Sequence, residues 1–192
     1  MLTERQIEII EKSIELIATR GIQGLTIKNL SKEIGISEPA IYRHFESKTD
    51  ILLTILRNFE EMTAFMNDAI KQMDNSTVEK IEFMFSKIID TFSVDPSQIS
   101  VVFSEEIFKN DAILKEMIVK IMNSKEKAIE DIILEGQNKG EIRTDIDNQT
   151  LALIVIGALR FRVKQWDLKD QHKDLKKEGD KLIKGLKKIL KK

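Results

Sequence analysis

The side chains best suited to chemistry gather in one short stretch of the N-terminal quarter, and they suit hydrogen bonding to nucleic acid. Arg43 can donate two parallel hydrogen bonds to guanine O6 and N7, and Glu38 can accept one from cytosine N4. Ser37 and Lys48 lie where helices are expected to begin, and free N–H groups there favour phosphate. The stretch predicts a DNA-contacting surface made of Thr26, Lys28, Ser37, Glu38, Pro39, Ala40, Tyr42, Arg43, His44 and Lys48.

Two short helices joined by a tight turn would position these side chains. Thr26 can cap the first helix, because its hydroxyl can accept a hydrogen bond from a free N–H of the first turn. Gly35 follows the apolar stripe of that helix and suits the left-handed residue that ends it. Ser37 is expected to cap the second helix, with Pro39 in its first turn. The buried faces are expected to consist of Ile27, Leu30, Ile34, Ile41 and Phe45.

This layout is typical of a helix-turn-helix, in which the second helix enters a DNA major groove. An ordinary helical hairpin that binds no nucleic acid would give a similar pattern. For two residues, a role other than DNA contact stays open. Tyr42 can be a partly buried structural tyrosine, and Glu38 would repel phosphate if it lay close to the DNA backbone.

The same stretch closely resembles the DNA-binding motif of TetR-family transcriptional regulators. The resemblance is carried by Thr26, by Ile34-Gly35-Ile36-Ser37, by Tyr42-Arg43-His44-Phe45 and by Ser47-Lys48. It is clear over about residues 3–56, and the remaining chain fits the family in length and helical rhythm. The resemblance implies an all-α fold of about nine helices, with a three-helix DNA-binding domain over residues 1–46 and a helical effector-binding and dimerisation domain over residues 47–192. In that family, the positions of Ser37, Tyr42 and Lys48 grip the DNA backbone.

Composition supports an all-α, water-soluble chain. The 192 residues include two prolines and eight glycines, and Ile, Leu, Lys and Glu are abundant. The absence of cysteine rules out a disulfide framework and fits a cytoplasmic location. The longest apolar run, residues 151–159, is half the length that a membrane span needs, so no membrane association is expected.

The charge of the chain is nearly balanced, which is unusual for a DNA-binding protein. The formal net charge is −1, and residues 1–50 hold seven basic and eight acidic residues. Backbone N–H groups at helix starts are therefore expected to help hold the phosphates. Residues 168–192 hold ten lysines and four acidic residues. That tail is either a second DNA contact or, as the pattern favours, a solvated helix face.

The central third of the chain concentrates methionine and phenylalanine, which suit an adaptable apolar cavity as well as a plain core. In the resembled family, the C-terminal domain encloses a small-molecule pocket. We expect a hydrophobic or amphipathic effector, of fatty-acyl or drug-like type. The candidate ligand-binding residues are Phe59, Met62, Thr63, Met66, Phe85, Phe92, Phe103, Met117 and Ile121.

The helix expected from about Asp147 is apolar on every side along residues 151–159, which indicates burial against a partner subunit. In the last helix, Leu175, Leu182 and Ile189 recur every seven residues and predict a bundle seam. Both helices can instead simply close the core of a monomer. The predicted homodimer interface consists of Leu151, Val155, Ala158, Leu159, Arg162, Leu182, Leu186 and Ile189.

No group of residues indicates an enzyme, a metal site or a cofactor. The chain has two histidines and no cysteine, and it lacks a glycine-rich phosphate loop and a nucleophile elbow. The sequence therefore predicts a ligand-responsive transcriptional regulator, most simply a repressor that a small apolar or amphipathic effector releases from a near-palindromic double-stranded DNA operator. The alternative is a helical interaction protein whose helix-turn-helix no longer reads DNA.

Overall fold

The computed structural model describes residues 2–103, 108–169 and 174–191, and these are all helix, turn or irregular chain. The expected all-α fold of about nine helices is confirmed. The elements in these residues are α1 (Glu4–Gly24), α2 (Ile27–Ile34), α3 (Glu38–Tyr42), α4 (Lys48–Lys71), α5 (Thr77–Val94), a short 3₁₀ helix (Pro96–Gln98), α6 (Ile99–Val102), α7 (Ala112–Asn138), α8 (Asn148–Asp167) and α9 (Leu175–Leu190). None of the described helices is both long enough and apolar enough to cross a bilayer.

The chain forms two compact units. The first unit combines residues 1–61 with residues 97–119, and the second combines residues 62–96 with residues 120–192. Helices α4 and α7 each begin in the first unit and end in the second. The expected functional boundary between residues 46 and 47 stays a prediction.

In the first unit, α1 begins at a capping box. The Thr3 hydroxyl accepts a hydrogen bond from the Gln6 N–H, and the Gln6 side chain accepts one from the Thr3 N–H. Gly21 kinks the helix with a φ of 66°, a conformation that glycine adopts without strain, and one more turn follows. Ile7 is exposed, and the core side of α1 is formed by Ile9, Ile10, Ser13, Leu16 and Ile17.

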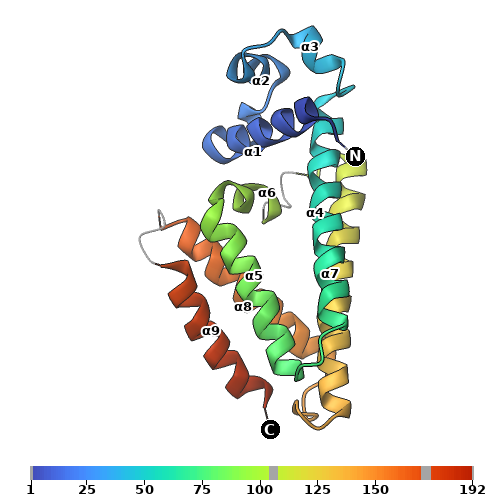
Figure 1. Cartoon of the computed structure of the whole chain (residues 1–192), viewed down its shortest axis with the longest axis vertical. Coiled ribbons are helices and arrows are strands. Elements are labelled where there is room, and N and C mark those ends of the chain that lie inside the picture. Colours follow the sequence, from blue (N-terminus) through green and yellow to red (C-terminus); the bar gives the residue numbers. More distant parts are fainter. Residues whose placement is uncertain (1, 104–107, 170–173, 192) are drawn as a thin grey trace. The chain divides into compact units, whose positions relative to one another are not determined.

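The turn between α2 and α3 has the predicted form. Gly35 takes a φ of 78° and its N–H donates to the Ser31 carbonyl, which closes the end of α2. Leu30, Ile41 and Phe45 are buried beneath the turn. Helix α1 packs against α2 on one side and α6 on the other, as Figure 1 shows. The turn therefore holds α3 at the surface of this helical group.

In the second unit, α9 packs against α5 and α8. The buried face of α9 consists of Leu175, Gly179, Ile183, Leu186 and Leu190. The predicted seam of Leu175, Leu182 and Ile189 is therefore wrong in part, because a straight helix repeats every 3.6 residues and a strict seven-residue spacing drifts off its face.

Helix α6 ends at Val102, and residues 104–107 lie outside the described part. Helix α9 as described begins at Leu175, after an Asp174 cap.

Candidate nucleic-acid interface

The predicted recognition residues lie at or near the surface of the first unit. Glu38, Pro39, Tyr42 and Arg43 are exposed, and Ala40 and His44 are partly exposed. Tyr42 keeps 52% of its accessible area, so about half of this side chain is open to solvent in the isolated chain. The buried Ile41 anchors α3 from beneath. The helix therefore presents its polar and aromatic residues outward.

Of the residues predicted at helix starts, Thr26 caps its helix through its side chain and Ser37 does not. Thr26 caps α2, with its hydroxyl accepting from the Asn29 N–H at 3.1 Å. Ser37 occupies the cap position of α3, but its hydroxyl makes no capping hydrogen bond, contrary to our expectation. An exposed hydroxyl of this kind remains available to a phosphate oxygen.

Lys48, at the start of α4, makes a hydrogen bond to the last turn of α1. Its Nζ donates to the Ile22 carbonyl oxygen at 2.9 Å, and partial burial lowers the pKa of the Lys48 ammonium below its ordinary value. An ammonium carries three donors, so two protons of Lys48 remain for phosphate. Near the other end of α1, the Gln6 side-chain amide donates to the His44 carbonyl at 3.3 Å. These two contacts fix the chain segment that follows α3.

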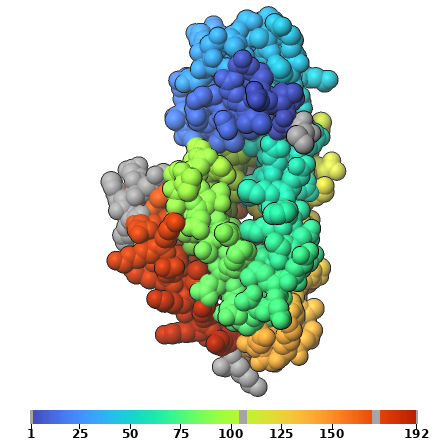
Figure 2. Space-filling model, viewed as in Figure 1, coloured from blue at the N-terminus to red at the C-terminus, as the bar shows by residue number. Residues whose placement is uncertain are grey.

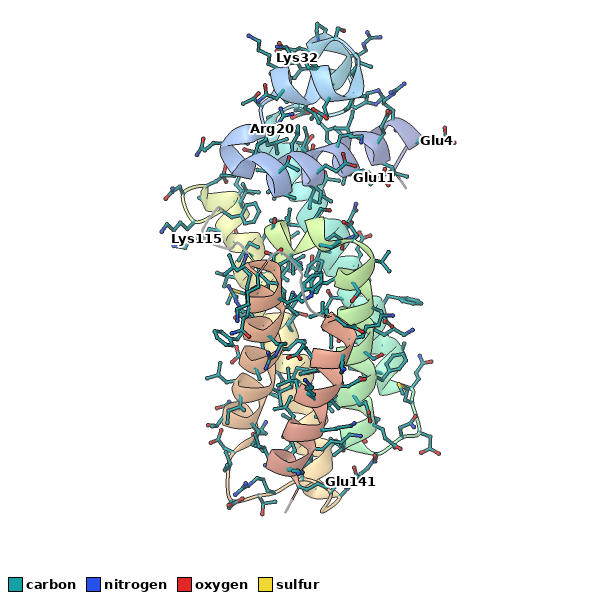
Figure 3. The ribbon with its side chains drawn as sticks, turned by 90° about the vertical axis from the view of Figure 1, so that its left-hand side faces the viewer. Glu4, Glu11, Arg20, Lys32, Lys115 and Glu141 are labelled. Atoms are coloured by element: carbon teal, nitrogen blue, oxygen red, sulfur yellow. The ribbon has the colours of Figure 1, made fainter. Side chains whose placement is uncertain are left out.

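Charge is sorted within the first unit. Figure 3 places Lys32 on α2, away from α1, whereas Glu4 and Glu11 lie along α1. Arg5 and Lys12 of α1 form ion pairs with Glu8 and Glu15, three residues further on. Half of the acidic residues among residues 1–50 therefore lie on α1, and Lys28, Lys32 and Arg43 are exposed on the α2–α3 side together with Glu33 and Glu38.

Substitution of Arg43 or Lys48 is expected to separate base contacts from phosphate contacts. Arg43→Ala should weaken binding to the specific operator by about 1–3 kcal/mol and relax the preference at one base pair, because a bidentate base contact is lost. Lys48→Ala should weaken all DNA sequences alike and reduce the salt dependence of binding. Titrations of both variants against operator and scrambled duplexes at several salt concentrations check these results.

Arg5→Ala is the matched control, because Arg5 is an exposed arginine paired on the acidic α1. It should bind DNA like the wild type. If Arg43→Ala and Lys48→Ala bound both duplexes as tightly as Arg5→Ala at moderate salt, α3 and the start of α4 would not be the DNA-contacting surface.

The predicted ligand-binding residues divide between the two units. Phe59, Phe103 and Met117 belong to the first unit, and the others belong to the second. Thr63, Phe92 and Ile121 are buried, whereas Met62 is exposed. Phe85 is fully buried and lines a space of about 10 Å³ between α5 and α9, which holds about one water molecule. In this structure Phe85 is therefore a core residue that faces α9; the remaining residues stay a prediction.

The predicted dimer residues of α8 need correction. Leu151, Val155 and Leu159 are buried within their own chain, because they face its core together with Ala152 and Val163. Leu186 of α9 is buried in the same way. In the isolated chain these four residues have little or no surface that a partner could contact. Ala158 and Leu182 are partly exposed, Ile189 is exposed, and Arg162 pairs with Glu178 at 3.1 Å.

The apolar residues of α8 that are exposed are Leu153, Ile154 and Phe161, and Gly157 is also exposed between them. Leu153 keeps 64% and Phe161 keeps 68% of its accessible area. The sequence signal for the buried face is the four-residue spacing of Leu151, Val155 and Leu159, because such a spacing places residues on one helix face. The apolar character of α8 thus serves two faces, one toward the core and one toward solvent.

Comparison with known proteins supports the same assignment. The model of the family described as bacterial regulatory proteins, tetR family, matches residues 9–55, and the model described as YsiA-like protein, C-terminal region, matches residues 58–188. A protein named fatty acid metabolism regulator protein, from Bacillus subtilis (strain 168), is 26% identical over 174 residues, which cover 89% of this chain and 88% of the relative.

Solved structures share the fold. The transcriptional regulator FadR from Bacillus subtilis, in complex with stearoyl-CoA, superimposes with a TM-score of 0.80 at 22% identity, covering 94% of this chain and 96% of that one. The ketosteroid transcriptional regulator KstR2 of Mycobacterium tuberculosis gives a TM-score of 0.85 at 16% identity, covering 100% and 97%. With both family models matched in order along the chain, the protein belongs to the tetR family of bacterial regulatory proteins, and it is a DNA-binding transcription regulator rather than an enzyme.

Proposed function

We propose that this regulator is a repressor that a long-chain fatty acyl thioester releases from its operator. The observation that carries the proposal is the match of residues 58–188 to the YsiA-like C-terminal region, together with 26% identity to a fatty acid metabolism regulator along most of both chains. The relative of the same fold that holds stearoyl-CoA supports the chemical class of the effector. An acyl thioester also fits the notion of an apolar cavity, because its chain is apolar and its head is polar.

The repressor acts in this proposal as a homodimer. Leu153, Ile154 and Phe161 form an exposed apolar face on α8, and Ile189 of α9 is exposed as well. A two-fold axis through such a face buries the same residues from both copies. Two copies of α3 then read two half-sites about one DNA turn apart, which requires a near-palindromic operator.

Helices α4 and α7 are the mechanical connection in this proposal, since each belongs to both units. Their N-terminal ends meet in the first unit: the Thr49 hydroxyl donates to the Asp111 carboxylate at 3.3 Å, and the same carboxylate caps α7 through the Ile113 and Leu114 N–H groups. A shift of either helix would therefore reach the segment that follows α3. A coupling free energy of about 1–3 kcal/mol would change operator affinity about 5- to 150-fold.

Acyl-CoA thioesters of increasing chain length are expected to stabilise the protein progressively. Each added methylene that leaves water contributes up to about 0.8 kcal/mol, so the melting temperature should rise with chain length until the cavity is full. The rise in melting temperature is measured by thermal unfolding with acyl-CoAs of about eight to eighteen carbons, the range over which affinity should increase with chain length. Free coenzyme A and a keto-steroid serve as comparison compounds.

If only the steroid raised the melting temperature, the effector would be a steroid and not an acyl thioester. If none of these compounds raised it, the proposed effector class would be wrong. Operator release is tested separately, by a gel shift on the DNA around the protein's own coding region with and without the stabilising acyl-CoA. Failure to shift any fragment at low salt would favour a helical interaction protein that no longer reads DNA.

A further inference from the structure

The outward face of α9 carries a row of lysines. Lys177, Lys181, Lys184 and Lys188 follow one another at intervals of four, three and four residues, which keeps them on one side of α9, and Lys191 is the extended residue that follows the helix. All five are exposed. They lie opposite the buried face of Leu175, Gly179, Ile183, Leu186 and Leu190, since the two sets are half a helical turn apart. We call these five residues the lysine row.

The lysine row differs from the other lysines of α9 in having few acidic partners. Lys176 and Lys187, on the flanks, pair with Asp90 and Glu82 of α5. Within the row, Lys181 pairs with Glu178 at 3.0 Å. The other four have no carboxylate within ion-pair distance among the residues that the structure describes.

Like charges three or four residues apart destabilise a helix, by about 0.2–0.5 kcal/mol for each neighbouring pair. The row holds three such pairs within α9, and Asp180, which lies three residues after Lys177 and four before Lys184, offsets only part of that cost. A polyanion bound along the row would convert the repulsion into attraction.

We propose that the lysine row is a second, sequence-independent DNA-binding surface. The eleven residue steps from Lys177 to Lys188 span about 17 Å of helix, a length over which a duplex presents about ten phosphates. Ammonium groups are point charges that attract phosphate without reading bases. The first 50 residues have seven basic and eight acidic residues, so the helix-turn-helix region supplies little of the general attraction to DNA, and the lysine row provides it.

Duplex DNA fits the row better than an anionic membrane does. A helix that binds a bilayer surface lays an apolar face into it beside its basic residues. The apolar face of α9 is buried against α5 and α8 within its own chain. Figure 2 shows α9, in red, at the surface with no other element over it in this view. The row is therefore open to a rigid polyanion and lacks the means to insert into lipid.

The triple variant K177Q/K184Q/K188Q tests the proposal against the matched control K71Q/K87Q/K169Q, which removes three exposed lysines of the second unit. Both variants have the same net charge, and glutamine preserves helix propensity. Binding to a 30-base-pair duplex of arbitrary sequence (about three turns of DNA, enough for one row) is measured by fluorescence anisotropy at several salt concentrations.

The triple variant should bind the arbitrary duplex about tenfold or more weakly at low salt, and its logarithmic salt slope should fall by about 2–3, because each phosphate contact contributes about 0.9. The control should behave like the wild type. Arg43→Ala should retain the arbitrary-sequence binding, which separates this surface from the helix-turn-helix. Thermal melting of the triple variant at or above the wild-type temperature verifies its fold.

Equal salt slopes for the triple variant and the control would overturn the proposal. So would binding of the wild type to phosphatidylglycerol vesicles that the triple variant loses while its DNA binding is unchanged, because the row would then serve a lipid surface. Neither result depends on the identity of the effector or of the operator.

Discussion

Replacing Leu153 and Phe161 with glutamate is expected to yield a monomer and to remove operator binding. The two side chains are the most exposed apolar residues within α8, eight residues apart and therefore on one side of the helix. Two carboxylates per subunit would have to be buried and unpaired at the two-fold axis, which costs several kcal/mol. Loss of the second recognition helix should weaken operator binding by about 10²-fold or more, because the two half-sites no longer act together. Analytical ultracentrifugation and a gel shift measure both effects.

Phe65→Glu is the matched control for this variant. Phe65 of α4 is 80% exposed, so the substitution also places a carboxylate on an exposed phenylalanine position, but on another helix. It should remain dimeric and bind the operator. If the α8 variant sedimented as a dimer, or if Phe65→Glu became monomeric while the α8 variant did not, the exposed face of α8 would not be the dimer interface.

The helix-turn-helix could be predicted from sequence because its determinants are local. A cap at Thr26, a left-handed Gly35 and the apolar residues Leu30, Ile41 and Phe45 lie within one stretch of 20 residues, and all five take their expected positions. Capping and glycine conformation depend on the chain itself rather than on distant packing. The exposure of the recognition residues follows directly from them.

The packing of α8 and α9 could not be predicted in the same way. A helix that is apolar all round does not reveal which side its own chain covers, and Val155, which the sequence predicts at the dimer interface, faces the core. Likewise, no local signal places residues 97–119 in the first unit, because that grouping arises from contacts with α1, far away in sequence. Long-range packing decides these features, and the periodicity of apolar residues does not show which elements pack together.

A buried ion pair in the second unit was also missed by sequence analysis. The Lys80 side chain on α5 is 5% exposed, and its Nζ lies 3.1 and 3.2 Å from the two carboxylate oxygens of Glu135 on α7. Glu135 is more accessible and also pairs with Lys139, one turn further along α7. Lys80 and Glu135 are 55 residues apart, so no spacing rule connects them.

Removal of the carboxylate is expected to cost far more stability than removal of the lysine. Glu135→Ala leaves the Lys80 ammonium buried without its partner and should lower the free energy of unfolding by about 3 kcal/mol. Lys80→Met keeps the volume of the side chain and leaves Glu135 paired with Lys139, so its effect should stay below about 1.5 kcal/mol. Urea unfolding of both variants at one protomer concentration measures the difference. Equal losses for the two variants would mean that Lys80 reaches water when Glu135 is absent.

The pH dependence of unfolding provides an independent check on the same pair. Hydrogen bonds from Lys139 and then from Lys80 lower the pKa of Glu135 in the folded protein. A lowered pKa contributes stability that is complete above the unfolded value of about 4.3 and is lost as the pH falls through the folded value. The stability advantage of the wild type over Glu135→Gln should therefore be constant from pH 7 to about 5 and shrink below it. An advantage that instead grew on acidification would show that the folded protein holds Glu135 in its protonated form.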